Sequence, residues 1–236
     1  QEYEPLAVFM VEEGEALASR LSRRLKKRSW TISVAESCTG GMIASMITNI
    51  SGSSSWFKQG WIVYSNDSKM RELGVESKAF DRGESGAVSH KVAIQMARGA
   101  RYKSRSNVAI AVTGIAGPGG DEDGKEIGRV HVAVMVEDYF IVRRMDFGDN
   151  DRVENKKSFA AFALRLALEA IDKVDESELK SKEALSLENK EIDDSQTLDP
   201  LSKEWEGSLS WGEEQITVAE SLKKIDLASL IDWDGN

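Results

Sequence analysis

Residues 30–50 read WTISVAESCTGGMIASMITNI, and this stretch decides the fold class. Its first six residues, 30–35, predict a strand. The paired glycines Gly40 and Gly41 then open a helix, which we expect over residues 42–50. A strand that leads through a short loop into a helix is the building unit of layered α/β folds.

The same alternation continues on both sides of this stretch. We expect a helix at 6–27, a strand at 60–64, a helix beginning near Lys69, a helix at 88–103, a strand at 107–112, a strand pair at 128–136 and 139–145, and a helix at 156–171. We therefore predict a three-layer α/β/α fold around a central mixed, largely parallel sheet. In such folds the ligand lies at the carboxyl ends of the strands, here in the loops after Val34, Tyr64 and Val112.

The charge of the chain is divided unevenly along its length. The formal net charge is −9, yet residues 172–236 hold 18 Asp and Glu against 7 Lys and Arg, so residues 1–171 are close to neutral. We predict a folded domain at 1–171 and an acidic, partly disordered C-terminal extension at 172–236. Trp205, Trp211 and Trp233 indicate that part of this extension docks on a surface.

Composition excludes several classes of protein. The single cysteine, Cys38, rules out a disulfide framework and a multi-cysteine metal site. No apolar run approaches the roughly 20 residues of a membrane span, and the N-terminus does not read as a signal peptide. Neither part of the chain is basic enough for nucleic-acid binding, since the basic run at 20–28 has the helical spacing of a solvated helix face. We expect a cytoplasmic protein without nucleic-acid or membrane partners.

Three motifs are candidates for chemistry. The first, AESCTGG at 35–41, lies between a strand and a helix, where backbone N–H groups and the helix N-terminus favour a phosphate or carboxylate. It lacks the lysine of an ATP-binding P-loop. The third, TGIAGPGG at 113–120, also follows a strand and offers backbone donors to an oxyanion or a phosphate. Taken locally, each is equally compatible with a simple turn or a flexible loop.

The second motif is GSSS at 52–55, followed by Tyr64 and Lys69. A serine hydroxyl needs a base, and a neutral lysine can act as one if burial or a place in the first turn of a helix lowers its pKa. Lys69 is predicted to lie in such a first turn, and Tyr64 to relay a proton or orient the lysine. Spacing alone also fits a surface lysine and a core tyrosine.

Together these motifs resemble the CinA C-terminal domain family. The resemblance covers residues 6–171 and rests on 34–41, on 52–54 with Trp56 and Phe57, and on 60–69, 73–75, 86–89, 96–100, 113–118 and Gly128. Single-domain members of that family are nicotinamide-mononucleotide deamidases. The resemblance thus implies an amidohydrolase that converts nicotinamide mononucleotide to nicotinic acid mononucleotide and ammonia, without metal or cofactor, and a homo-oligomer.

The resemblance also implies the roles of individual residues. Ser54 matches the nucleophile, Lys69 the base and Tyr64 its helper. The substrate-binding residues that it implies are Ser37, Thr39, Gly40, Gly41, Thr113, Gly114, Gly117 and Arg152. Arg152 is the nearest candidate for the arginine of the family's Gly-Asp-Arg segment, because residues 147–152 read FGDNDR.

Two alternatives are open. Cys38 at a helix N-terminus is a second candidate nucleophile, because that position lowers a thiol pKa. The chain is alternatively a catalytically silent nucleotide-binding or interaction module whose acidic tail recruits a partner. A penicillin-recognising Ser/Lys hydrolase is rejected, since its Lys-Thr-Gly motif is missing and the two apparent motifs lie too close together.

Overall fold

The computed structural model describes residues 4–81, 86–119 and 126–196. The chain divides into a compact unit at 1–186 and a second unit from Leu187 onward. The helices are α1 (Glu4–Arg28), α2 (Met42–Thr48), α3 (Asn66–Leu73), α4 (His90–Ser104) and α5 (Arg152–Gln196), with 3-10 turns η1 (Ser53–Ser55) and η2 (Ser77–Phe80). The strands are β1 (Ile32–Glu36), β2 (Phe57–Ile62), β3 (Val108–Gly114), β4 (Arg129–Val136) and β5 (Tyr139–Asp146).

These five strands form one mixed sheet in the order β2-β1-β3-β4-β5. β1 pairs in parallel with β2 and with β3, whereas β4 is antiparallel to β3 and to β5. Only β4 therefore runs against the other strands, which confirms the predicted mixed sheet. The predicted strand pair is the β4–β5 hairpin. Because β1, β2 and β3 are parallel, their carboxyl ends meet at one edge of the sheet, as the ligand prediction requires.

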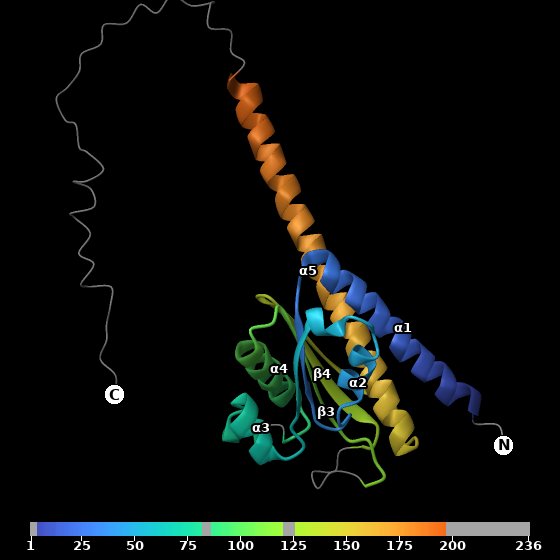
Figure 1. Ribbon diagram of the computed structural model, residues 1–236. Coiled ribbons are helices and arrows are strands. Elements are labelled where there is room, and N and C mark those ends of the chain that lie inside the picture. Colours follow the sequence, from blue (N-terminus) through green and yellow to red (C-terminus); the bar gives the residue numbers. More distant parts are fainter. Residues whose placement is uncertain (1–3, 82–85, 120–125, 197–236) are drawn as a thin grey trace, which may run out of the picture. The chain divides into compact units, whose positions relative to one another are not determined.

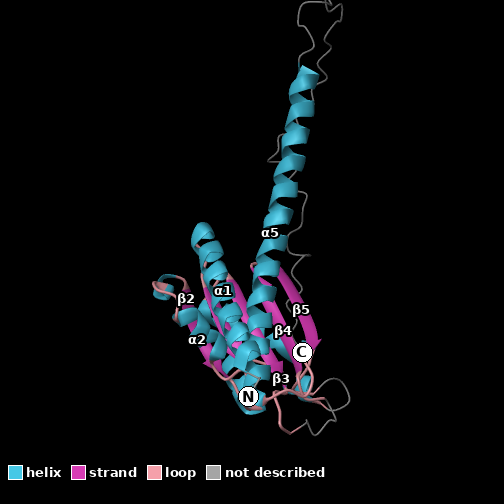
Figure 2. Cartoon of the chain, turned by 90° about the vertical axis from the view of Figure 1, so that its right-hand side faces the viewer, coloured by secondary structure: helices cyan, strands magenta, loops and turns pink. Residues whose placement is uncertain are grey.

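The two faces of the sheet are covered by different helices, so the predicted three layers are present (Figure 1). On one face, α1, α2 and α5 pack on branched side chains such as Ile32, Val34 and Ile110. On the other, α4 packs on alanines, including Ala35, Ala109 and Ala111. Side chains alternate between the faces of a strand, so one strand supplies both surfaces. Figure 2, turned by 90°, shows α1, α2 and α5 in front of the strands.

The alanine face lets α4 lie close to the sheet, and α4 in turn seats α3. Gly99 of α4 contacts the C-terminal end of α3 so closely that a Cβ there would lie 1.9 Å from the Leu73 carbonyl oxygen. Atoms at that distance overlap, so the backbone of α3 would have to move. Glycine at 99 therefore fixes where α3 lies, although glycine inside a helix weakens it by roughly 1 kcal/mol.

The predicted domain boundary at residue 171 lies inside α5. The Asp151 carboxylate accepts a hydrogen bond from the Val153 N–H at 2.8 Å and caps the first turn, so α5 begins at Arg152, before the predicted start at 156. It then runs without interruption past Ile171. The part of the predicted extension beyond Gln196, with its three tryptophans, lies outside the described residues, as does Gly120, the last residue of the predicted glycine-rich motif.

The basic run at 20–28 has partners on α5. Arg24 pairs with Asp172 and with Asp175, and Arg28 pairs with Asp175 and with Glu178. These ion pairs join the last turns of α1 to the first residues of the predicted acidic extension, so this part of the run is not the solvated face that its spacing predicted. Among the described helices none is long and apolar enough to cross a membrane.

Candidate active site

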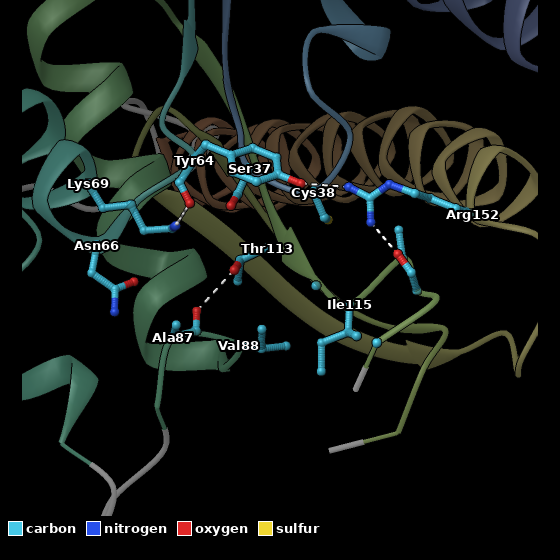
Figure 3. A pocket seen from close by; sticks show the side chains of 14 residues that line it. Ser37, Cys38, Tyr64, Asn66, Lys69, Ala87, Val88, Thr113, Ile115 and Arg152 are labelled. Carbon is cyan, nitrogen blue, oxygen red and sulfur yellow. Dashed lines mark hydrogen bonds between the residues drawn. The ribbon is translucent and has the colours of Figure 1, made fainter. Parts of the chain in front are cut away.

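A cavity of about 270 Å³ lies at the edge of the sheet where β1, β2 and β3 end. Seven of the predicted site residues line it: Ser37, Tyr64, Lys69, Thr113, Gly114, Gly117 and Arg152. Figure 3 shows Ser37 and Cys38 below the Tyr64 ring, with Lys69 on one side of the cavity and Arg152 on the other. Four predicted residues do not line it: Ser54, Thr39, Gly40 and Gly41.

Lys69 is the buried cation of this cavity. Its side chain lies on the first turn of α3, is 2% exposed, and donates a hydrogen bond from Nζ to the Tyr64 carbonyl oxygen at 3.3 Å. Burial lowers the pKa of Lys69 from 10.5 to about 8, because the charged form loses its hydration. Among the described residues no carboxylate pairs with this ammonium, so little opposes that shift.

Ser37 follows β1 directly and is fixed by its backbone. Its N–H donates to the Val112 carbonyl oxygen at 3.0 Å, which continues the β1–β3 ladder by one residue. The Ser37 side chain is 8% exposed and faces the cavity that Lys69 also lines. A serine and a lysine of lowered pKa therefore share one partly closed space.

Tyr64 and Arg152 meet across the mouth of the cavity. The Arg152 Nη2 donates to the Tyr64 hydroxyl at 2.6 Å, and Nη1 donates to the Gly117 carbonyl oxygen. Tyr64 therefore accepts a hydrogen bond from Lys69 at its backbone carbonyl and one from Arg152 at its hydroxyl. The residue is 59% exposed. Both described partners of Arg152 are neutral, so among the described residues no carboxylate pairs with the guanidinium at the cavity mouth.

The first loop is held by a residue that the sequence analysis did not single out, Glu36. This buried carboxylate accepts hydrogen bonds from the backbone N–H groups of Gly41 at 2.9 Å, Ile43 at 3.2 Å and Ala44 at 2.8 Å. The N-terminus of α2 is therefore already occupied by an anion of the chain itself. The Gly41 N–H, a predicted substrate contact, is thus already used by Glu36, whereas the substrate contacts at Thr39 and Gly40 stay predictions.

Cys38 lines the cavity but does not have the properties of a nucleophile. Burial raises the pKa of its thiol to about 12, and the nearby Glu36 carboxylate acts in the same direction. The effect of Lys69 and of the local backbone N–H groups is smaller and opposite. A thiol with this pKa is protonated at neutral pH, so the alternative of a Cys38 nucleophile loses its basis.

Ser54 lies at the opposite edge of the sheet from Tyr64 and Lys69. It is exposed in η1, which precedes β2, whereas Tyr64 follows the same strand. β2 alone, from Phe57 to Ile62, spans about 17 Å at the usual rise of about 3.3 Å per residue. A base must lie within hydrogen-bond reach of the hydroxyl that it activates. The structure thus brings Tyr64 and Lys69 together but not Ser54 with them.

Other residues of the cavity lie in segments that carry the family resemblance but were not among the predicted site residues. Asn66 begins α3, and Ala87 and Val88 belong to the loop before α4. This loop is tied to β3 because the Thr113 hydroxyl donates to the Ala87 carbonyl oxygen at 3.0 Å. Among the described residues no group of three or more His, Cys, Asp and Glu is placed to hold a metal ion.

The fold and the cavity define a three-layer α/β domain with a serine and a buried lysine at the carboxyl edge of its sheet. The CinA C-terminal domain matches residues 14–171, and the chain belongs to this family. A CinA-like protein of Geotalea daltonii is 47% identical over 151 residues, which are 64% of this chain and 36% of that protein. A putative competence-damage inducible protein of Clostridioides difficile is 43% identical over 143 residues, 60% of this chain and 34% of that protein.

Solved structures of CinA proteins are similar to this chain as well. The competence/damage inducible protein CihA of Agrobacterium tumefaciens superposes with a TM-score of 0.64 at 41% identity, over 68% of this chain and 96% of that one. A CinA superfamily protein of Escherichia coli superposes with a TM-score of 0.63 at 34% identity, over 66% and 88% of the two chains. The chain spans about a third of the length of the curated relatives that it matches.

Proposed function

We propose that the protein is an amidase that hydrolyses nicotinamide mononucleotide to nicotinic acid mononucleotide and ammonia, with Ser37 as its nucleophile. The observation that carries the proposal is the shared cavity of Ser37 and the buried Lys69. At the lowered pKa of about 8, roughly a tenth of the lysine is neutral at pH 7. An ordinary lysine would be neutral in only about a few molecules in ten thousand.

The reaction proceeds in two steps. Neutral Lys69 takes the proton of the Ser37 hydroxyl while the oxygen attacks the carboxamide carbon, and the C–N bond then breaks as Lys69 returns the proton to the leaving ammonia. Water attacks the resulting ester, Lys69 again accepts a proton, and the acid leaves with Ser37 restored. The oxyanion is assigned to backbone N–H groups of the turn that follows Ser37. Tyr64 orients the base through its carbonyl group.

Arg152 supports a nucleotide substrate because its guanidinium can bind a phosphate. Its guanidinium at the cavity mouth has only neutral described partners, the Tyr64 hydroxyl and the Gly117 carbonyl. A phosphate would replace these contacts with stronger, charge-assisted hydrogen bonds. The cavity is small for a whole nucleotide, so the ring and its carboxamide enter while the phosphate stays at the mouth. Cytoplasmic location and assembly into a homo-oligomer are part of the same proposal.

The test compares nicotinamide mononucleotide with nicotinamide riboside, which lacks the phosphate. Ammonia and acid formation are measured for the wild type and for Arg152→Gln, with Ser37→Ala as the background control. We expect the wild type to prefer the mononucleotide in kcat/KM by about 10- to 100-fold, and Arg152→Gln to abolish most of that preference. An unchanged preference in the variant contradicts the role of Arg152. Binding of the mononucleotide without turnover supports the silent nucleotide-binding module instead.

A further inference from the structure

Asn66 occupies a fixed position beside the base. It is the first residue of α3, and the preceding Ser65 caps the helix in a reciprocal pair with Ser68, with backbone-to-hydroxyl distances of 3.1 Å in both directions. This pair holds the backbone of the first turn. Asn66 and Lys69 are three residues apart, so their side chains lie on the same side of the helix, and both line the cavity (Figure 3).

The side-chain amide of Asn66 is not used to hold the fold. Ser65 and Ser68 bind one another, and Asp67 pairs with Arg71 at 2.7 Å. Among the described residues, by contrast, no hydrogen-bond partner faces the Asn66 amide. The first turn of α3 therefore uses three polar side chains for its own structure and presents the fourth to the cavity.

The cavity has different chemistry at its two sides. Arg152 lies at one side with only neutral partners among the described residues, whereas Asn66 offers a neutral amide beside Lys69 at the other. An amide side chain both accepts and donates hydrogen bonds. A primary carboxamide has the complementary groups, whereas a carboxylate offers acceptors only. A substrate whose anion is bound by Arg152 thus presents its carboxamide to Lys69 and Asn66.

We infer that Asn66 is a specificity-determining residue that recognises the carboxamide of the substrate, with Oδ1 accepting from the NH₂ group that leaves as ammonia. The inference rests on the proposed amidase function. It explains how the site favours substrate over product: a carboxylate has no N–H for Asn66 Oδ1, so the product keeps at most a bond from Asn66 Nδ2, with Oδ1 left facing an oxygen. Two acceptors that face each other repel, which promotes release of the acid.

The experiment measures discrimination between amide and acid in the whole 236-residue chain. KM and kcat for nicotinamide mononucleotide and the inhibition constant of nicotinic acid mononucleotide are determined for the wild type, Asn66→Ala, Asn66→Asp and the control Asp67→Ala. We expect Asn66→Ala to raise KM for the amide by about 10-fold and to bring the inhibition constant of the acid close to that KM. Asn66→Asp keeps an acceptor, so it retains binding of the amide and weakens binding of the acid. Asp67→Ala leaves both values unchanged.

Binding to the Ser37→Ala chain separates this inference from the proposed function. Calorimetric titration with the amide and with the acid gives their affinity ratio without any turnover. If the wild type does not turn over the mononucleotide but the ratio depends on Asn66, the amidase proposal fails and the recognition stands. A ratio that does not change when Asn66→Ala is added to this chain overturns the inference, as does failure of both ligands to bind.

Discussion

The loop after β1 and the loop before β2 both carry serines, but they lie at opposite edges of the same sheet. The first places Ser37 in a cavity with Lys69, and its backbone is fixed by the buried Glu36 carboxylate. The second places Ser54 on an exposed 3-10 turn, at the other end of β2 from Tyr64 and Lys69. The difference teaches that the end of a strand decides the surroundings of a serine in this fold, because the loops that follow three parallel strands gather at one end of the sheet.

The sharpest test of this comparison exchanges each serine for alanine. We expect Ser37→Ala to lower kcat for mononucleotide deamidation by about 10⁴-fold or more, because the proposed acyl intermediate forms on the Ser37 hydroxyl. Ser54→Ala should change kcat by less than about 2-fold, as expected for an exposed substitution distant from the site. Steady-state ammonia release measures both. A large loss in Ser54→Ala with an active Ser37→Ala would reverse the assignment of the two loops.

Lys69 should make the activity of the Ser37 site depend on pH. Since the neutral amine is the base, kcat/KM should rise with pH and level off above the pKa of about 8. Lys69→Met, of similar length but unable to accept a proton, should lose about 10²- to 10³-fold in kcat and show no such rise. A pH profile of kcat/KM for the two proteins checks this. A wild-type profile that stays flat across the pKa of Lys69 in the same assay would contradict its role as the base.

The same substitution should make the folded chain more stable. The pKa of Lys69 is lower in the folded state, about 8, than its ordinary 10.5, so the unfolded chain binds more protons between these values and stability rises with pH across that window. Below pH 8 Lys69 is charged in the folded state, so the full free-energy cost of burying its ammonium lowers the stability. Lys69→Met removes it and should raise the free energy of unfolding at pH 7 by about 3 kcal/mol. Urea unfolding at pH 7 and pH 10 measures the difference, which should narrow at the higher pH.

The smallest expected effect concerns what holds each loop. Glu36→Ala leaves three backbone N–H groups at the start of α2 without their acceptor, and we expect it to lower the free energy of unfolding by about 2–3 kcal/mol. The matched change in the other loop is Ser55→Ala, whose hydroxyl donates to the Gly52 carbonyl at an exposed position. It should cost less than about 1 kcal/mol. The free energies are measured by thermal unfolding. Equal losses for Glu36→Ala and Ser55→Ala would contradict the stronger stabilisation of the first loop.

Much of the fold could be predicted because the local patterns agree with it. The predicted strand at 107–112 is apolar from Val108 onward and becomes β3, buried on both faces, and the strand pair at 128–136 and 139–145 becomes the β4–β5 hairpin. Lys69 also lies in the first turn of α3 as predicted, because Ser65 is a good N-cap. These patterns depend on residues close together in the sequence, and the elements of the structure agree with them.

The features that local patterns miss concern relations between distant segments. Ser54 is the nucleophile that the family resemblance predicts, whereas the order of the elements places residue 54 before a strand and residue 37 after one, which is the basis for proposing Ser37. A buried acidic residue at the end of an apolar strand, Glu36, was a signal for an internal helix cap. α5 continues through residue 171, where Asp172 and Asp175 pair with Arg24 of α1, and no local pattern contains these pairs. These features arise from tertiary contacts.

Gly99 shows how far such contacts reach. Its missing side chain admits the Leu73 carbonyl, and that close approach seats the helix on which both Lys69 and Asn66 stand. A methyl group at this one position would lift α3, admit water to Lys69 and let the amine keep its proton. In a mutational scan for activity, substitutions of Gly99 would therefore lower activity as substitutions of a catalytic residue do. Their effect would come through the position of α3, since Gly99 does not line the cavity.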